Sequence, residues 1–120
     1  MSQPLVLVVE DEPLVAMLIE DMLADLGCTV AETTDRLEPA LRAANESTFD
    51  FAMIDVNLAG QPAYPVADRL AARGIPFIFI TGYGAGGIDS AYAAAPVLAK
   101  PFHTEQFERV VRELLPVRQD

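Results

Sequence analysis

Polar side chains follow four of the apolar segments of this chain, at the point where each segment ends. Glu10, Asp11 and Glu12 come directly after the apolar run Leu5–Val9. The three other segments end in single polar residues, which are Asp55, Thr81 and Lys100. Carboxylates, a hydroxyl and an ammonium group are the side chains with which proteins bind hard metal ions and phosphoryl groups.

Carboxylates that converge at one point repel each other. Two unit charges about 4 Å apart interact by about 4 kcal/mol at an effective dielectric constant of 20, and the stability of a whole domain is only about 5–15 kcal/mol. We therefore expect the acidic cluster to be neutralised by raised pKa values, by Lys100 or by a cation. All-oxygen ligands favour a hard ion such as Mg²⁺, which typically binds one or two carboxylates together with a phosphoryl oxygen.

Asp55 stands alone at the end of its apolar segment, Phe51–Ile54. A carboxylate beside Mg²⁺ can attack phosphorus and form an aspartyl phosphate. The metal and Lys100 would then supply positive charge to the transferred phosphoryl group, and Thr81 would supply a hydroxyl. Each of these residues alone is more simply explained as a solvated side chain, a helix cap or a turn residue. The joint pattern is what predicts phosphoryl chemistry.

The elements that must position these residues alternate between strand and helix. Apolar runs predict five strands, at Leu5–Val9, Cys28–Ala31, Phe51–Ile54, Pro76–Ile80 and Val97–Ala99. Helical spacing and capping signals predict a helix that begins at Pro13 and ends before Gly27, one around Pro39–Ala44, and one over Val66–Arg73. A last helix is predicted to begin at the Thr104 cap and to end before Pro116. This alternation predicts a parallel sheet with helices on both faces, and ligands bind at the carboxyl edge of such a sheet.

Between Gly82 and Pro96 the chain is rich in glycine and offers barely two helical turns, which predicts a weak or mobile fourth helix. Gly82, Gly84 and Gly87 match the spacing of a dinucleotide-binding fingerprint. They follow the fourth expected strand and do not open a βαβ unit, so we interpret them as a loop.

The composition bounds the class of protein. A chain of 120 residues with 52% apolar residues predicts a single globular domain over residues 1–120. One cysteine, Cys28, predicts a reducing compartment, and we interpret it as a small core residue. The sequence shows no N-terminal signal pattern and no long apolar span, from which we expect a cytoplasmic location. His103 has no second histidine beside it and is interpreted as a turn residue. The net charge of −10 disfavours nucleic acids and anionic membrane surfaces as partners.

The polar residues at the strand ends and the residues around them resemble those of a two-component response-regulator receiver domain. The stretches that carry the resemblance, in the family's order and spacing, are "VEDE", "MIDVNL", "ITG" and "KPF". The resemblance covers essentially the whole chain and implies a flavodoxin-like, doubly wound, five-stranded parallel sheet with strand order 2-1-3-4-5. It implies a signal-transduction module of a phosphorelay, which takes a phosphoryl group from a histidine kinase or phosphotransfer protein. No enzymatic activity is implied beyond self-catalysed phosphorylation and dephosphorylation.

The resemblance also assigns roles to individual residues. Asp55 is the expected phosphoacceptor, and Thr81 and Lys100 are expected to contact the phosphoryl group. The expected Mg²⁺ ligands are Asp11, Glu10 through a water molecule, Asp55 and the backbone carbonyl of Asn57. Phosphorylation is expected to change the surface around residues 81–102, with the switch residues Thr81, Tyr83, Val97 and Pro101. The Lys100–Pro101 peptide bond is expected to be cis.

A narrower resemblance concerns the segment "PFIFITGYG", which is similar to the FATGUY subgroup of receivers. That subgroup is associated with kinases of the HWE type. Ile80 replaces the alanine of the motif, and Val97 replaces the aromatic residue that most receivers carry three positions before the lysine. Because valine has no ring to swing inward, we expect phosphorylation to order Gly82–Pro96 instead, with Tyr83 as the side chain that repositions.

Two other function classes stay open at the level of sequence. A haloacid-dehalogenase-like phosphohydrolase also forms an aspartyl phosphate, but usually carries a second aspartate where this chain has Asn57. A degenerate receiver that acts only as a docking surface would be expected to have lost the aspartate, the threonine or the lysine. The chain ends soon after the last expected helix, so it is either a stand-alone receiver or part of a longer protein.

Overall fold

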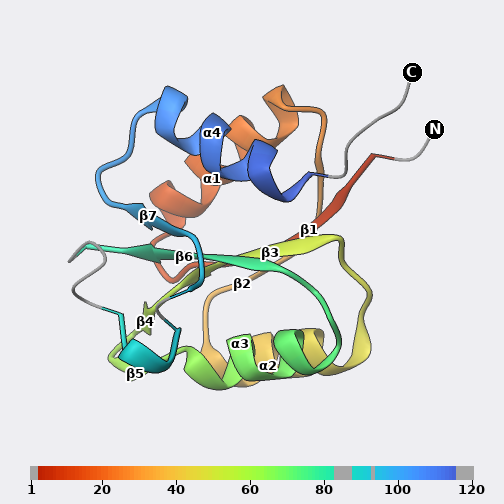
Figure 1. Cartoon of the computed structure of the whole chain (residues 1–120), viewed down its shortest axis with the longest axis vertical. Helices are drawn as coiled ribbons and strands as arrows, with labels where there is room; N and C mark the ends of the chain where they lie inside the picture. Colours follow the sequence, from red (N-terminus) through yellow and green to blue (C-terminus); the bar gives the residue numbers. More distant parts are fainter. Residues whose placement is uncertain (1–2, 83–87, 93, 116–120) are drawn as a thin grey trace.

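The centre of the molecule is a five-stranded parallel sheet in the order β2-β1-β3-β6-β7 (Figure 1). The computed structural model describes residues 3–82, 88–92 and 94–115. Its sheet consists of Leu5–Val9 (β1), Thr29–Thr34 (β2), Phe51–Asp55 (β3), Phe77–Thr81 (β6) and Val97–Ala99 (β7). Counted along the chain, these strands have the order 2-1-3-4-5, which confirms the predicted doubly wound, flavodoxin-like fold.

The described α-helices lie on both faces of the sheet (Figure 1). Helices α1 (Pro13–Asp25) and α4 (Thr104–Leu114) lie on one face, and α2 (Leu37–Glu46) and α3 (Tyr64–Ala72) lie on the other. Parallel strands need such crossover connections because consecutive strands must start from the same edge. None of the described helices is long and apolar enough to span a lipid bilayer.

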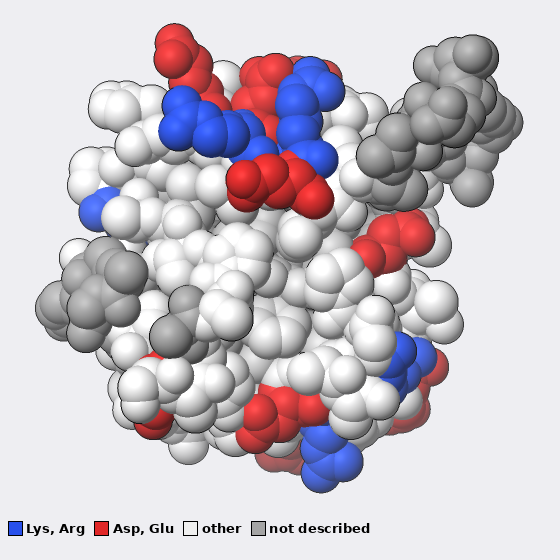
Figure 2. Space-filling model, in the orientation of Figure 1, with Lys and Arg blue, Asp and Glu red and all other residues white. Residues whose placement is uncertain are grey.

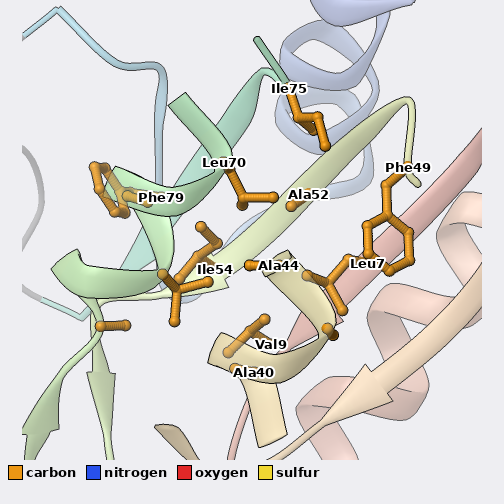
Figure 3. Packing of buried hydrophobic residues seen from close by; sticks show 14 of the residues in the cluster. Leu7, Val9, Ala40, Ala44, Phe49, Ala52, Ile54, Leu70, Ile75 and Phe79 are labelled. Carbon is orange, nitrogen blue, oxygen red and sulfur yellow. The ribbon is translucent and has the colours of Figure 1, made fainter. Parts of the chain in front are cut away.

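The two faces of the sheet make two hydrophobic cores. Val6 and Val8 of β1 pack on the side of α1 and α4, whereas Leu7 and Val9 pack on the side of α2 and α3. Figure 3 shows this second core, in which Leu7 and Val9 of β1 lie in one cluster with Ala40 and Ala44 of α2. Because the central strands are covered on both faces, they read as continuous apolar runs in the sequence.

Several element boundaries differ from the prediction, and β6, for example, is shifted by one residue. β2 runs from Thr29 to Thr34, beyond the predicted Cys28–Ala31, because this edge strand keeps pairing with β1 after its apolar residues end. The third helix begins at Tyr64, two residues before the predicted start. Thr104 does not cap α4 but is its first helical residue. The cap is His103, whose backbone N–H donates to Gln106 Oε1 at 2.9 Å.

Other predicted features are confirmed. Cys28 is buried, and helices α1 and α3 end where Gly27 and Gly74 adopt positive φ angles of 82° and 72°. A positive φ is accessible to glycine at little cost, which is why it so often follows a helix end. The Lys100–Pro101 bond is cis.

The connection from β6 to β7 contains no α-helix in its described part. One turn of 3₁₀-helix, Ser90–Tyr92 (η2), lies there, consistent with the weak helix that the sequence predicts. Residues 83–87 and 93, and with them the predicted switch residue Tyr83, lie outside the described residues. The structure also contains a two-stranded hairpin that the sequence did not predict, β4 (Asn57–Leu58) with β5 (Gln61–Pro62).

Candidate functional site

The polar residues at the four strand ends lie together at the carboxyl edge of the sheet. Strands β1, β3, β6 and β7 are neighbours in that order, so the residues that follow them meet at one edge. The backbone N–H of Lys100 donates to the carbonyl of Thr81 at 2.8 Å, which continues the pairing of β6 with β7 and fixes Lys100 beside Thr81. The predicted convergence is therefore present.

Four carboxylates form the acidic cluster of this site. One carboxylate oxygen from each of Glu10, Asp11, Glu12 and Asp55 lies within 4.8 Å of the others. The side chain of Glu10 is fully buried and that of Asp55 is 8% exposed, whereas that of Glu12 is 61% exposed. The cluster thus reaches from the protein interior to solvent.

Lys100 is the cation of this cluster and the only lysine in the chain. Its Nζ atom lies 3.1 Å from Glu10 Oε1, 3.0 Å from Glu12 Oε1 and 3.1 Å from Asp55 Oδ2. One ammonium group is therefore shared among three carboxylates, and the negative charge of the cluster exceeds what this lysine can neutralise.

Burial and crowding shift the pKa values of these groups. Burial, followed by the interaction with Asp55, raises the pKa of Glu10 to about 7. The pKa of Asp55 is also raised by burial, although Glu10, the Asn57 N–H and Lys100 act against this shift. Burial alone would lower the pKa of Lys100, but its carboxylate neighbours outweigh burial and raise it. Lys100 is therefore charged at neutral pH, and the pair of Glu10 and Asp55 tends to retain a proton.

The loop after β3 closes around the acidic cluster through backbone donors. The N–H of Ala59 donates to Asp11 Oδ2 and that of Asn57 donates to Asp55 Oδ1, both at 3.1 Å. The side-chain oxygen of Asn57 accepts the N–H of Gly60 at 2.9 Å, in a turn where Ala59 and Gly60 have positive φ angles. These bonds orient two of the carboxylates and use the Asn57 side chain for the turn.

The predicted switch residues that the structure describes differ in burial and in packing. Thr81 is buried at the end of β6, and Val97 pairs with Phe79 in the adjacent strand and packs against the α2–α3 core. Pro101 is exposed. A different aromatic residue, Tyr92, lies against Phe79, with ring centroids 5.7 Å apart at 90°.

An apolar groove lies beside the acidic cluster. It has a volume of about 370 Å³ and is lined by Glu12, Val15, Leu18, Lys100, Pro101 and Phe102. Helix α1 continues this surface outward, because Leu14 is 81% exposed and Met17 is 57% exposed. The groove thus connects the charged site to an exposed apolar surface.

The sequence did not predict the contact between Glu12 and Lys100. Glu12 belongs to the acidic triplet, but its position gives no information on which way its side chain points. The sequence does contain a signal that Glu12 has a role other than helix capping, since glutamate is not among the residues preferred at the position immediately before a helix.

Comparisons with known proteins agree with this geometry. A model of the response regulator receiver domain matches residues 6–112. The curated transcriptional regulatory protein TcrA of Mycobacterium tuberculosis is 31% identical over 116 residues, which cover 91% of this chain and 45% of TcrA. The chain spans about half the length of the curated relatives it matches.

Two solved structures resemble the whole chain. SdrG from Sphingomonas melonis Fr1 is 42% identical with a TM-score of 0.85, over 95% of this chain and 98% of SdrG. The receiver domain of the sensor histidine kinase PA1611 from Pseudomonas aeruginosa is 27% identical with a TM-score of 0.81, over 94% of this chain and 98% of that domain. The PA1611 structure has a magnesium ion coordinated in its active site cleft.

Neither alternative function class is favoured by these findings, since the receiver model spans most of the chain and the aspartate, threonine and lysine are all present. The similarity to SdrG fits the FATGUY subgroup. The chain therefore belongs to the response regulator receiver domain family, and so is a phosphoacceptor module of two-component signalling.

Proposed function

We propose that Asp55 accepts the phosphoryl group, which a histidine kinase or phosphotransfer protein donates. The observation that carries this proposal is the contact of 3.1 Å between Asp55 Oδ2 and Lys100 Nζ inside the acidic cluster. An Asp55 carboxylate oxygen would form the new bond to phosphorus while the phosphorus–nitrogen bond of the donor phosphohistidine breaks. Lys100 and Thr81 would contact the transferred group, and no further enzymatic activity is proposed.

The site is suited to Mg²⁺. Its donor set is all oxygen, and four carboxylates face one lysine. Glu10 Oε1 is buried without a hydrogen bond among the described residues, although Lys100 Nζ lies 3.1 Å away. Asp11, Asp55 and the backbone carbonyl of Asn57 would hold the ion directly, and Glu10 would hold it through water. The ion would supply positive charge to neutralise the phosphoryl oxygens.

The surface beside the site supports a protein as the phosphoryl donor. The exposed apolar residues Leu14, Met17 and Leu18 continue the groove at Lys100, and apolar patches of this kind mark protein interaction sites. In view of the FATGUY segment, a kinase of the HWE type is the proposed donor, in the cytoplasm. The net charge of −10 disfavours nucleic acids and anionic membrane surfaces as partners, and on the face in Figure 2 the basic side chains lie next to acidic ones and do not form a separate basic patch.

The test of this proposal is phosphorylation by a small-molecule donor. With Mg²⁺ and acetyl phosphate, the intact mass of the chain should rise by one phosphoryl group. Asp55→Asn should stay unmodified, because an amide is a poor nucleophile and cannot form the acyl phosphate. Asp50→Asn, which changes an exposed aspartate before the same strand, serves as the matched control and should be labelled like the wild type. Equal labelling of Asp55→Asn would place the acceptor elsewhere.

We further propose that the phosphorylated state changes the segment from Gly82 to Pro96. Thr81 would move toward the phosphoryl group and order the glycine-rich part, with Tyr83 repositioned and Val97 and Pro101 at its border. The SdrG relative has a BeF₃-activated structure, so beryllofluoride is a suitable phosphate mimic here. Hydrogen exchange should show more added protection across Gly82–Ala95 than in α4. Unchanged exchange in this segment, with large changes elsewhere, would contradict the proposal.

A further inference from the structure

Glu12 occupies the N-cap of α1, but its side chain does not cap the helix. The usual N-cap side chain accepts a hydrogen bond from a backbone N–H in the first turn. Glu12 has the extended backbone of a cap, with φ −91° and ψ 111°, yet makes no such bond. Its carboxylate instead lies 3.0 Å from the Nζ atom of Lys100, which is 88 residues further along the chain.

The contact joins Lys100 to a carboxylate outside the proposed metal ligands. Glu10 and Asp55, the other two partners of Lys100, are buried and belong to that ligand set. Glu12 is largely exposed. Its backbone is nevertheless fixed to the site, because its N–H donates to Glu10 Oε2 at 3.1 Å.

A cation held by Asp55 directly and by Glu10 through water would compete with Lys100 for these two carboxylates. A divalent cation at these carboxylates and the ammonium group of Lys100 would repel each other. Lys100 would therefore shift away from these carboxylates, and its side chain is only 19% exposed, so solvation would compensate the lost contacts only in part. Glu12 is not among the proposed ligands, so its carboxylate would remain available as a partner for the ammonium group.

We propose that Glu12 is a positioning residue that would keep a carboxylate partner beside Lys100 when Mg²⁺ occupies the proposed ligands, and so favours Mg²⁺ binding. This inference rests on the proposed function. Without the Glu12 carboxylate, Lys100 would pair more tightly with Glu10 and Asp55 and compete better against the metal.

The expected effect on Mg²⁺ affinity is modest. Glu12 is mostly exposed, and exposed ion pairs typically change affinities and stabilities by less than tenfold. We expect Glu12→Gln to weaken Mg²⁺ binding roughly two- to fivefold. Glu12→Asp keeps the charge but withdraws the carboxylate from Lys100 by one methylene, so it should weaken Mg²⁺ binding similarly.

The test is a titration of the full chain with Mg²⁺ at constant ionic strength, followed by backbone amide chemical shifts in NMR. Lys100→Met should bind Mg²⁺ more tightly than the wild type, because the competing cation is gone. In that background Glu12→Gln should have little further effect. Asp21→Asn removes one exposed charge from the same helix and should bind like the wild type.

The outcomes separate this inference from the proposed function. Absence of Mg²⁺ binding by the wild type, or undiminished binding by Asp11→Asn, would contradict the metal site itself. If the wild type binds, Asp11→Asn does not, and Glu12→Gln and Glu12→Asp both match the wild type, only the role of Glu12 is overturned. An equal loss from Glu12→Gln with and without Lys100 would also overturn it, since Glu12 would then act only as a nearby charge.

Discussion

Glu10 is an ionisable residue whose burial disfavours its charged form. Its side chain is fully buried beside Asp55, and its pKa is raised to about 7 from an ordinary value of 4.5. A carboxyl group with a raised pKa in the folded state stabilises the fold while it is protonated, and this contribution is lost as the pH rises through the folded-state pKa. The metal-free protein should therefore lose stability between about pH 4.5 and pH 7.

Urea unfolding in EDTA at pH 5 and pH 8 would measure this loss. One pKa unit corresponds to about 1.4 kcal/mol, so we expect Glu10 to contribute a decrease on the order of 2 kcal/mol in the free energy of unfolding. Glu10→Gln cannot ionise and should be less sensitive to pH than the wild type. Identical pH dependence of the two proteins would show that Glu10 does not carry this proton.

Those site residues that directly follow a strand could be predicted from the sequence. Parallel strands bring their carboxyl ends together, so Asp55, Thr81 and Lys100 could be grouped without coordinates. The contact between Glu12 and Lys100 could not, because the direction of an exposed side chain depends on its neighbours in space. Which of the buried carboxylates retains a proton also depends on burial, which the sequence does not contain.

At the scale of elements, the 3₁₀ turn η2 is held to α3 by an aromatic cluster. The ring of Tyr92 stacks on that of Tyr64 with centroids 4.5 Å apart and planes 5° apart. The Tyr92 hydroxyl donates to Asp68 Oδ1 at 2.5 Å, and the N–H of Asp89 donates to the Tyr64 hydroxyl at 2.7 Å. The hydrogen bond to Asp68 is the main reason why the pKa of Tyr92 rises to about 12.

Substitution of Tyr92 should therefore loosen η2 in the unphosphorylated protein. Aromatic pairs contribute about 0.5–1.5 kcal/mol and a hydrogen bond to a charged group contributes about 1.5–3 kcal/mol. Because Tyr92 is only half-buried, we expect Tyr92→Ala to cost about 1–2 kcal/mol and to speed hydrogen exchange at residues 88–92. Tyr92→Phe keeps the stacked ring and should have a smaller effect. Unchanged exchange in both variants would show that the cluster does not hold the segment.

Whether a segment forms a helix or a strand could be predicted where its apolar residues repeat regularly. The residues at which these elements begin and end could not be predicted as well. β3 is buried along its whole length and was found within one residue, whereas β2 continues through the polar residues Glu32 and Thr33. The hairpin of β4 and β5 has two residues in each strand, too few for any periodic pattern. Its turn residue Ala59 donates a backbone hydrogen bond to Asp11 Oδ2, a contact between residues 48 positions apart in the sequence.

At the scale of the whole molecule, the site lies where several surfaces meet. The apolar groove at α1 borders Lys100 on one side, and β6 connects Thr81 to the aromatic cluster of Phe79, Tyr64 and Tyr92 on the other. A phosphoryl group on Asp55 would therefore be close both to the surface proposed for the donor and to the segment proposed to change.

The most direct measurement is to locate the phosphorylated residue chemically. Borohydride reduces an aspartyl phosphate to homoserine, which survives digestion and is located by tandem mass spectrometry. After treatment with acetyl phosphate and Mg²⁺, homoserine should appear at Asp55 and at no other aspartate, and it should be absent when Mg²⁺ is removed by EDTA. Homoserine at Asp11, or a phosphoryl group that resists borohydride because it sits on a hydroxyl or on His103, would contradict the account.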